Sequence, residues 1–315
     1  MKPNQNHSAA VDITGNDFYP RYLAAKKSID DRALNRHVWE TLRQGLAQTP
    51  GREPLHILEI GAGIGTMFQR VMEQGLFSGS ATYVLSDSDP GQLSAARKYL
   101  SKWAQSQGRI LTWSGENHGR LRSAGAEVSV ELIPAGAQEL ADPSGAPGPF
   151  HLLMAHAVLD LLDFPSILPG ILQRLTQNGL AYLTCNFDGQ TLFLPEWDGE
   201  EKIMQGYHES MEARLSGASR TGRRLLSFIQ RPGLELLAAG SSDWVIHPRN
   251  AGYSDDERFF LHAIIETVKR ELGPKNILPS LAAWARLRHQ QVEDGQLSFL
   301  ARHIDLLARR RWVLS

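Results

Sequence analysis

The segment Leu55–Thr66, which reads LHILEIGAGIGT, constrains the fold of this chain more than any other stretch. Residues 55–60 form a short apolar run of the length expected for a buried parallel strand. Gly61, Gly63 and Gly65 follow at once, and a helical pattern of apolar residues comes directly after them. The segment therefore predicts a strand, a tight turn and a helix, with free backbone N–H groups of the turn facing a ligand.

The spacing of the glycines indicates which ligand the turn serves. A dinucleotide-binding fingerprint, G-x-G-x-x-G, is excluded because Thr66 occupies the third glycine position, and the Lys of a phosphate-binding P-loop is missing. The pattern present is E-x-G-x-G-x-G, from Glu59 to Gly65. A second strand is expected at 82–85 and ends near Asp87, where a carboxylate can accept hydrogen bonds from both hydroxyls of a ribose.

Together these features resemble the class I (Rossmann-like) S-adenosylmethionine-dependent methyltransferases that act on small molecules. The resemblance covers residues 55–190 well and the remainder loosely. It implies an α/β fold with a doubly wound, seven-stranded, mostly parallel sheet. It also implies a helical lid at 1–50, a cofactor-binding methyltransferase domain at 51–315, and a substrate cap inserted after strand five at about 187–232.

The resemblance also implies that S-adenosyl-L-methionine is the cofactor. The implied contacts come from the glycine turn, the tip of strand two, the turn after strand three, the end of strand four and the lid: Glu59, Gly61, Ala62, Gly63, Gly65, Asp87, Ser88, Gln138, His156, Tyr22 and Arg32. Asp87 is preferred to Asp89 as the ribose ligand because the superfamily pattern places that ligand first. Gln138 is the expected adenine contact because Ala137 stands where the superfamily has an aspartate.

The regular alternation of strand and helix stops after a fifth strand. The remaining expectations are a loop insertion or short hairpin at 108–127, strand five at 180–185, the end of a helix at 234–238, strand six at 243–247, helices at about 255–272 and 280–293, and a strand seven or a helix in the run QLSFLARHIDLLAR.

The acceptor site is expected where the cap covers the end of strand five. Its candidate residues are Asn186, Tyr207, His208, Arg220 and Arg223, with His208 and His156 as candidate catalytic bases. The two arginines suit an anionic group on the acceptor, although a solvated helix start is the interpretation favoured for them. No grouping of His, Asp and Glu has metal-ligand spacing, so no metal is expected.

Composition limits the function further. The net charge is −1, from 33 basic and 34 acidic residues, so nothing attracts the whole chain to nucleic acid or to a membrane. Its single cysteine, Cys185, and the lack of a long apolar run indicate a cytoplasmic protein. The predicted function is methyl transfer to O, N or C of a small molecule by in-line displacement. An RNA or protein methyltransferase, and a binding protein without catalysis, remain as alternatives.

Overall fold

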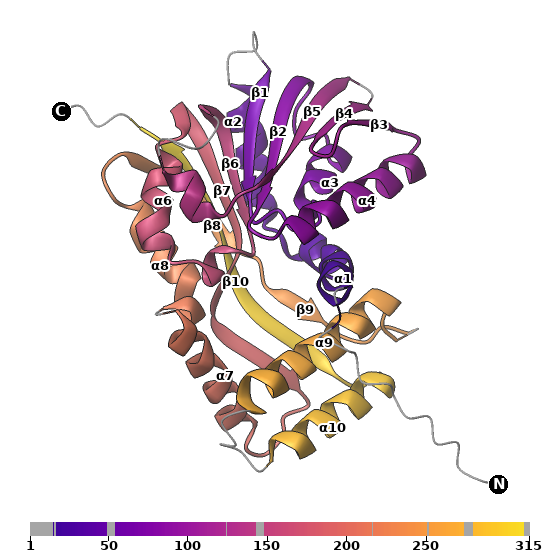
Figure 1. Cartoon of the computed structure of the whole chain (residues 1–315). Coiled ribbons are helices and arrows are strands. Elements are labelled where there is room, and N and C mark those ends of the chain that lie inside the picture. The colour runs from indigo at the N-terminus through magenta and orange to yellow at the C-terminus, as the bar shows by residue number, and fades with distance from the viewer. Residues whose placement is uncertain are drawn as a thin grey trace.

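The computed structural model describes residues 15, 17–48, 54–123, 125–142, 148–215, 217–250, 252–273 and 280–311 (Figure 1). The helices are α1 (Phe18–Ala33), α2 (Arg36–Ala47), α3 (Thr66–Glu73), α4 (Pro90–Ser106), α5 (Ala137–Ala141), α6 (Phe164–Leu172), α7 (Glu200–Arg214), α8 (Thr221–Ile229), α9 (Asp255–Leu272) and α10 (Leu281–Glu293), with 3-10 turns η1 (Leu159–Leu161) and η2 (Ala218–Arg220). The strands are β1 (Leu55–Ile60), β2 (Gly79–Asp87), β3 (Ile110–Ser114), β4 (His118–Ser123), β5 (Ala126–Pro134), β6 (Phe150–His156), β7 (Leu175–Leu194), β8 (Leu234–Ser241), β9 (Trp244–Ile246) and β10 (Ser298–Arg310).

One sheet connects all of these strands, in the order β3-β4-β5-β2-β1-β6-β7-β10-β8 with β9 beside β10. The pairs from β5 to β7 are parallel, whereas β10 is antiparallel to both of its neighbours, β7 and β8. The central strands from β5 to β7 run in the order of a doubly wound sheet, as the resemblance implies. The predicted fold class is therefore confirmed.

Helices cover both faces of the sheet. On one face, α2, α3 and α4 bury apolar side chains such as Leu42, Phe68 and Leu100. On the other face, α5, α6 and α8 do the same, for example with Leu168 and Phe228. Buried strands with helices on both faces are the arrangement in which ligands bind at the carboxyl ends of the strands.

The sheet has more strands than the predicted seven. The 108–127 segment is a hairpin, β3 and β4, that extends the edge next to β5. Strand six is β8, at Leu234–Ser241, so the expectation of a helix end there and of strand six at 243–247 was wrong. Because β8 is an edge strand with an irregular burial pattern, its sequence lacks the alternation that distinguishes a strand. The 243–247 segment instead forms β9, a short additional strand.

Strand five is much longer than predicted. β7 continues from Leu175 to Leu194, and its second half pairs with the first half of β10, which also pairs with the short strand β9. Figure 1 shows β7 and β10 running beyond the rest of the sheet, with α7, α9 and α10 gathered around their far ends. Side chains such as Ile203, Ile265 and Trp284 form a separate apolar core there. The predicted cap at 187–232 thus begins inside β7, and helices later in the chain share its core. The predicted domain boundaries stay a prediction.

Among the described residues, no helix is both long and apolar enough to cross a membrane.

A buried ion pair fixes the helices of this second core. Arg288 on α10 is completely buried, and its Nε and Nη2 donate to Glu200 Oε1 on α7 at 3.0 and 2.6 Å. The indole Nε1 of Trp284 donates to the same oxygen at 2.6 Å. The carboxylate of Glu200 therefore compensates a guanidinium charge that has no access to water.

We expect Glu200→Gln to lower the free energy of unfolding by about 3–5 kcal/mol, because the charge of Arg288 stays buried without its carboxylate. Urea unfolding followed by circular dichroism measures this change. Glu201→Gln, at the exposed neighbouring position, is the control and should change the stability by less than about 0.5 kcal/mol. Equal stability of both variants would show that Glu200 does not compensate the buried charge of Arg288.

Candidate active site

The glycine turn after β1 adopts a backbone that side chains rarely allow. Gly61, Gly63 and Gly65 have φ values of 61°, 53° and 81°. A Cβ atom at Gly61 would lie 2.4 Å from Val158 Cγ2, and one at Gly63 would lie 2.6 Å from Leu23 Cδ1. The first two glycines are thus required both by conformation and by the close packing of the lid helix and the segment after β6.

Asp87 joins the tip of β2 to this turn. Its Oδ2 accepts a hydrogen bond from Gly63 N at 2.9 Å, and its Oδ1 accepts one from Asp89 N at 3.0 Å. Asp89 instead caps α4 by accepting from Gly91 N at 2.8 Å. Of the two carboxylates considered as ribose ligands, the one in contact with the glycine turn is therefore Asp87. Ser88 follows it and is exposed.

Glu59 lies inside the sheet. It is 2% exposed, and its Oε2 accepts a hydrogen bond from the hydroxyl of Tyr83 on β2 at 2.6 Å. Burial raises the pKa of Glu59 to about 7, against the opposing effects of the Tyr83 hydrogen bond and of the nearby Arg70 charge. Near neutral pH this carboxyl is thus close to half protonated, and its hydrogen-bond partner is a phenol.

His156, at the end of β6, is part of a buried polar cluster that holds α1 on the sheet. Its Nδ1 lies 2.9 Å from Thr184 Oγ1 and its Nε2 lies 2.9 Å from Asp30 Oδ2. Asp30 also pairs with Lys26 Nζ at 2.9 Å and accepts from Trp244 Nε1 at 3.0 Å. Burial lowers the pKa of His156 to about 4, so the imidazole is neutral at pH 7. Although burial opposes it, Lys26 and His156 hold the pKa of Asp30 below its ordinary value.

Within the described residues, one group of three potential metal ligands occurs in this same cluster. Ligand atoms of Asp30, His156 and Cys185 lie within 4.8 Å of one another. The ammonium of Lys26 already supplies a cation to the carboxylate, and burial raises the pKa of the Cys185 thiol, which keeps it protonated. The charges of the cluster are thus balanced without a metal ion.

Two predicted site residues have partners within the protein, and a third is exposed. Arg32 Nη2 donates to Glu257 Oε1 at 2.6 Å and so joins α1 to α9. Asn186 is completely buried, and its Nδ2 donates to two backbone carbonyls of β7 and β10. Gln138 is exposed on α5. No ligand contact is shown for them, and their proposed roles stay predictions.

The aromatic candidates lie on α1 and α7. Tyr22 stacks on Phe260 of α9, with ring centroids 5.5 Å apart. The rings of Tyr207 and His208 are 5.9 Å apart on α7, and His208 Nε2 lies 3.2 Å from Thr191 Oγ1. Burial lowers the pKa of His208, so this imidazole is also neutral at pH 7.

The two predicted substrate-binding arginines already have carboxylate partners. Arg223 Nε and Nη2 donate to Asp188 Oδ1 and Oδ2 at 2.7 and 3.1 Å. Arg220 Nε lies 3.7 Å from Glu212 Oε1. An anionic acceptor would have to compete with these carboxylates, so the anion clamp stays a prediction.

Asp160 was not predicted from the sequence. It follows β6 in η1, and its Oδ1 is buried with no hydrogen-bond partner in the described part of the chain. Burial raises the pKa of this carboxyl, and a hydrogen bond from its own backbone N–H and the charges of Lys26 and Arg214 oppose that shift. The only signal in the sequence was an acidic residue shortly after the fourth predicted strand.

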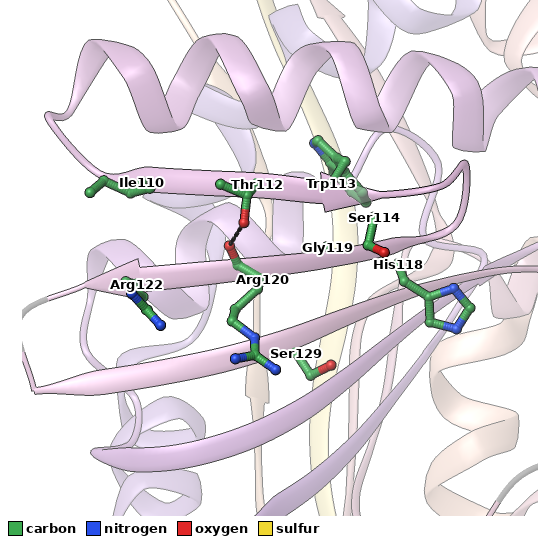
Figure 2. Close-up of a pocket in the computed structure, with 9 residues that line it drawn as sticks. All are labelled: Ile110, Thr112, Trp113, Ser114, His118, Gly119, Arg120, Arg122 and Ser129. Atoms are coloured by element: carbon green, nitrogen blue, oxygen red, sulfur yellow. Dashed lines mark hydrogen bonds between the residues drawn. The ribbon is translucent and has the colours of Figure 1, made fainter.

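A hollow of about 460 Å³ lies on the hairpin at the edge of the sheet. Figure 2 shows Arg120 and Arg122 projecting from β4 beside it, with Ser129 on β5 and Thr112 on β3. None of the predicted site residues lines it. A second hollow of the same volume, between α6 and α8, includes Arg223.

Comparison with family models and with curated protein sequences gives no match. Solved structures do match. A putative methyltransferase from Bacillus halodurans is 15% identical over 86% of this chain and 99% of that one, with a TM-score of 0.48. The YcgJ protein from Bacillus subtilis is 12% identical over 87% and 99%, with a TM-score of 0.46.

The plantazolicin methyltransferase BpumL, in complex with SAH, is 15% identical over 95% of this chain and 92% of that one, with a TM-score of 0.44. At these identities, and with TM-scores below 0.5, the likeness concerns the fold alone. The assignment of the fold depends on the strand order.

The raised pKa of Glu59 predicts a pH-dependent stability. Between its ordinary value of 4.5 and about 7, the folded protein binds a proton that the unfolded chain has lost. Stability should therefore fall as the pH rises through this window. Glu59→Gln removes the charge but keeps an acceptor for Tyr83, so its loss of stability from pH 5 to pH 8 should be smaller than that of the wild type by about 1–3 kcal/mol.

Urea unfolding at the two pH values, without cofactor, measures this difference. Asp305, whose pKa burial raises to about 6, titrates in both proteins and cancels in the comparison. Parallel pH profiles of the two proteins would show that Glu59 is ionised in the folded state throughout.

Proposed function

We propose that this protein transfers the methyl group of S-adenosylmethionine to a small-molecule acceptor. The observation that carries the proposal is the contact between Asp87 Oδ2 and Gly63 N at the carboxyl ends of β1 and β2. In a sheet of this order, that edge is where a nucleoside ligand binds. A carboxylate beside a left-handed glycine turn offers acceptors for ribose hydroxyls and a backbone that a ligand can approach closely.

The residues present fit this cofactor. Asp87 and the glycine turn would hold the ribose and the amino acid portion, and Leu23 of α1 lies beside Gly63 of the same turn. When bound, S-adenosylmethionine supplies a methyl group on a positively charged sulfur. The chain itself then has to position the acceptor, exclude water and accept any proton that the acceptor loses.

Two features support a small acceptor over RNA or a protein. The lid helix α1 is tied to α9 of the second core by stacked rings and by the Arg32 to Glu257 ion pair, and its Leu23 lies beside Gly63 of the glycine turn. The net charge of −1 provides no general attraction for a polyanion. We also propose a cytoplasmic location, which the single buried Cys185 supports.

The two proposed bases differ in their availability. Both ring nitrogens of His156 face partners, Thr184 and Asp30. His208 has a partner on Nε2 only, among the described residues, and it is about half-buried. Of the two, His208 is therefore the one that has a nitrogen free to accept a proton from a bound acceptor.

We expect the protein to bind S-adenosylmethionine and S-adenosylhomocysteine, but not NAD, in isothermal titration calorimetry. Asp87→Ala should weaken both by tenfold or more, because two hydrogen bonds to a charged acceptor are lost, each worth about 1.5–3 kcal/mol. Gly61→Val should abolish binding, since its side chain would meet Val158 and its positive φ would be strained.

Asp89→Asn is the matched control for Asp87, and we expect it to bind the cofactor as the wild type does. Binding of NAD alone, or unchanged affinity in both Asp87→Ala and Gly61→Val, would show that the proposal is wrong.

Once the acceptor has been found by incubating the protein with labelled S-adenosylmethionine and a metabolite extract, His208→Ala should lower kcat by about 10²-fold, as expected for loss of a general base. His247→Ala, at an exposed histidine bonded to a backbone carbonyl, is the control. A wild-type kcat for His208→Ala would remove this residue from the mechanism and leave the cofactor assignment intact.

A further inference from the structure

The carboxylate of Asp160 is the starting point. Its Oδ1 is buried and, within the described ranges, receives no hydrogen bond. A buried carboxylate oxygen without a donor costs free energy, so such a group commonly has a partner that is absent from the free protein. Two residues earlier, Val158 packs against Gly61, which places Asp160 next to the glycine turn.

Three tyrosines on two helices lie within electrostatic range of this carboxylate. Tyr19 and Tyr22 on α1 stack with ring centroids 6.2 Å apart, and Tyr207 comes from α7. Burial is the main cause that raises the pKa of all three phenols, and the negative charge of Asp160 adds to it in each case. In the described part of the chain, none of the three hydroxyls has a hydrogen-bond partner, and each ring remains partly open to solvent.

The charges around Asp160 leave it uncompensated. The cations that act on it are Lys26 and Arg214. Lys26 is already paired with Asp30 at 2.9 Å, and Arg214 lies 3.8 Å from Glu271. Each of these pairs is close to neutral, so the cluster carries about one negative charge, that of Asp160.

The other groups at this end of the sheet do not change that balance. His156 is neutral at pH 7, because burial lowers its pKa to about 4. Asp87 is negative, but backbone N–H groups of Gly63 and Asp89 already donate to its oxygens. The site therefore favours a ligand that brings a positive charge.

We propose that Asp160, with the rings of Tyr19, Tyr22 and Tyr207, binds the methyl acceptor as a cationic amine. An ammonium group would donate to the carboxylate and lie against electron-rich aromatic faces, which attract cations. This inference deepens the proposed methyl transfer and rests on it, because the subsite borders the turn assigned to the cofactor.

The test uses the whole protein saturated with S-adenosylhomocysteine. Butylamine, which is charged at pH 7.5, and 1-butanol, its neutral counterpart of the same shape, are titrated and followed by saturation-transfer NMR. We expect the wild type to bind the amine at least tenfold more tightly than the alcohol. Asp160→Asn should remove that preference, whereas Asp163→Asn, at a nearby exposed carboxylate, should keep it.

Two variants of Tyr207 distinguish the contribution of its ring to amine binding from that of its hydroxyl. Tyr207→Phe should retain amine binding, while Tyr207→Leu should weaken it at least threefold. Calorimetry with S-adenosylhomocysteine should give wild-type affinity in all four variants, which also shows that they are folded.

Equal binding of amine and alcohol to the wild type, or wild-type amine binding in Asp160→Asn, would overturn the proposal. So would a loss of affinity in Asp160→Asn for S-adenosylmethionine but not for S-adenosylhomocysteine, because the carboxylate would then face the sulfonium. If the protein bound neither sulfur compound, the proposed function would fail, and the amine titration of the free protein would still test the subsite.

Discussion

The carboxylate of Asp30 holds the lid helix α1 against the sheet at the candidate active site. It lies on α1, yet its partners Lys26, His156 and Trp244 come from α1, β6 and β9. Because the carboxylate is almost completely buried, removal of any one partner leaves a charge or a donor in the interior without compensation. The position of the lid helix over the strand ends therefore depends on an electrostatic cluster as well as on apolar packing.

That cluster keeps the lid helix α1 in contact with both the sheet and the second core. α1 carries Leu23 against the glycine turn, and Tyr22 against the second core. A ligand at the turn and a ligand among the tyrosines would therefore both contact the same helix.

The sequence was sufficient to predict the parts of the fold that local patterns determine. The glycine turn, the parallel strands on either side of β1 and the antiparallel strand at 298–310 were all predicted, the last with a helix as the alternative. The extension of β7 was not, because the segment after Cys185 gains its strand partner from β10, more than a hundred residues later. β8 was mistaken for a helix end because an edge strand needs no regular alternation.

The site residues also fall into those that a local sequence pattern predicts and those that it does not. Asp87 could be placed from its distance to the glycine turn along the chain. The cluster around Asp30 could not, since Asp30 and His156 are 126 positions apart and nothing local in either segment indicates the contact. Asp160 was passed over because an unpartnered oxygen is a property of the packed structure and has no counterpart in a sequence pattern.

The strand pair formed by the second half of β7 and the first half of β10 has a mechanical consequence. It belongs to the sheet at one end and to the second core at the other. Its register shifts between Ala301 and His303 and again between Ile304 and Leu306, where extra residues bend and twist a strand. The strand pair that joins the two cores is therefore bent at these bulges, between the parallel part of the sheet and the second core.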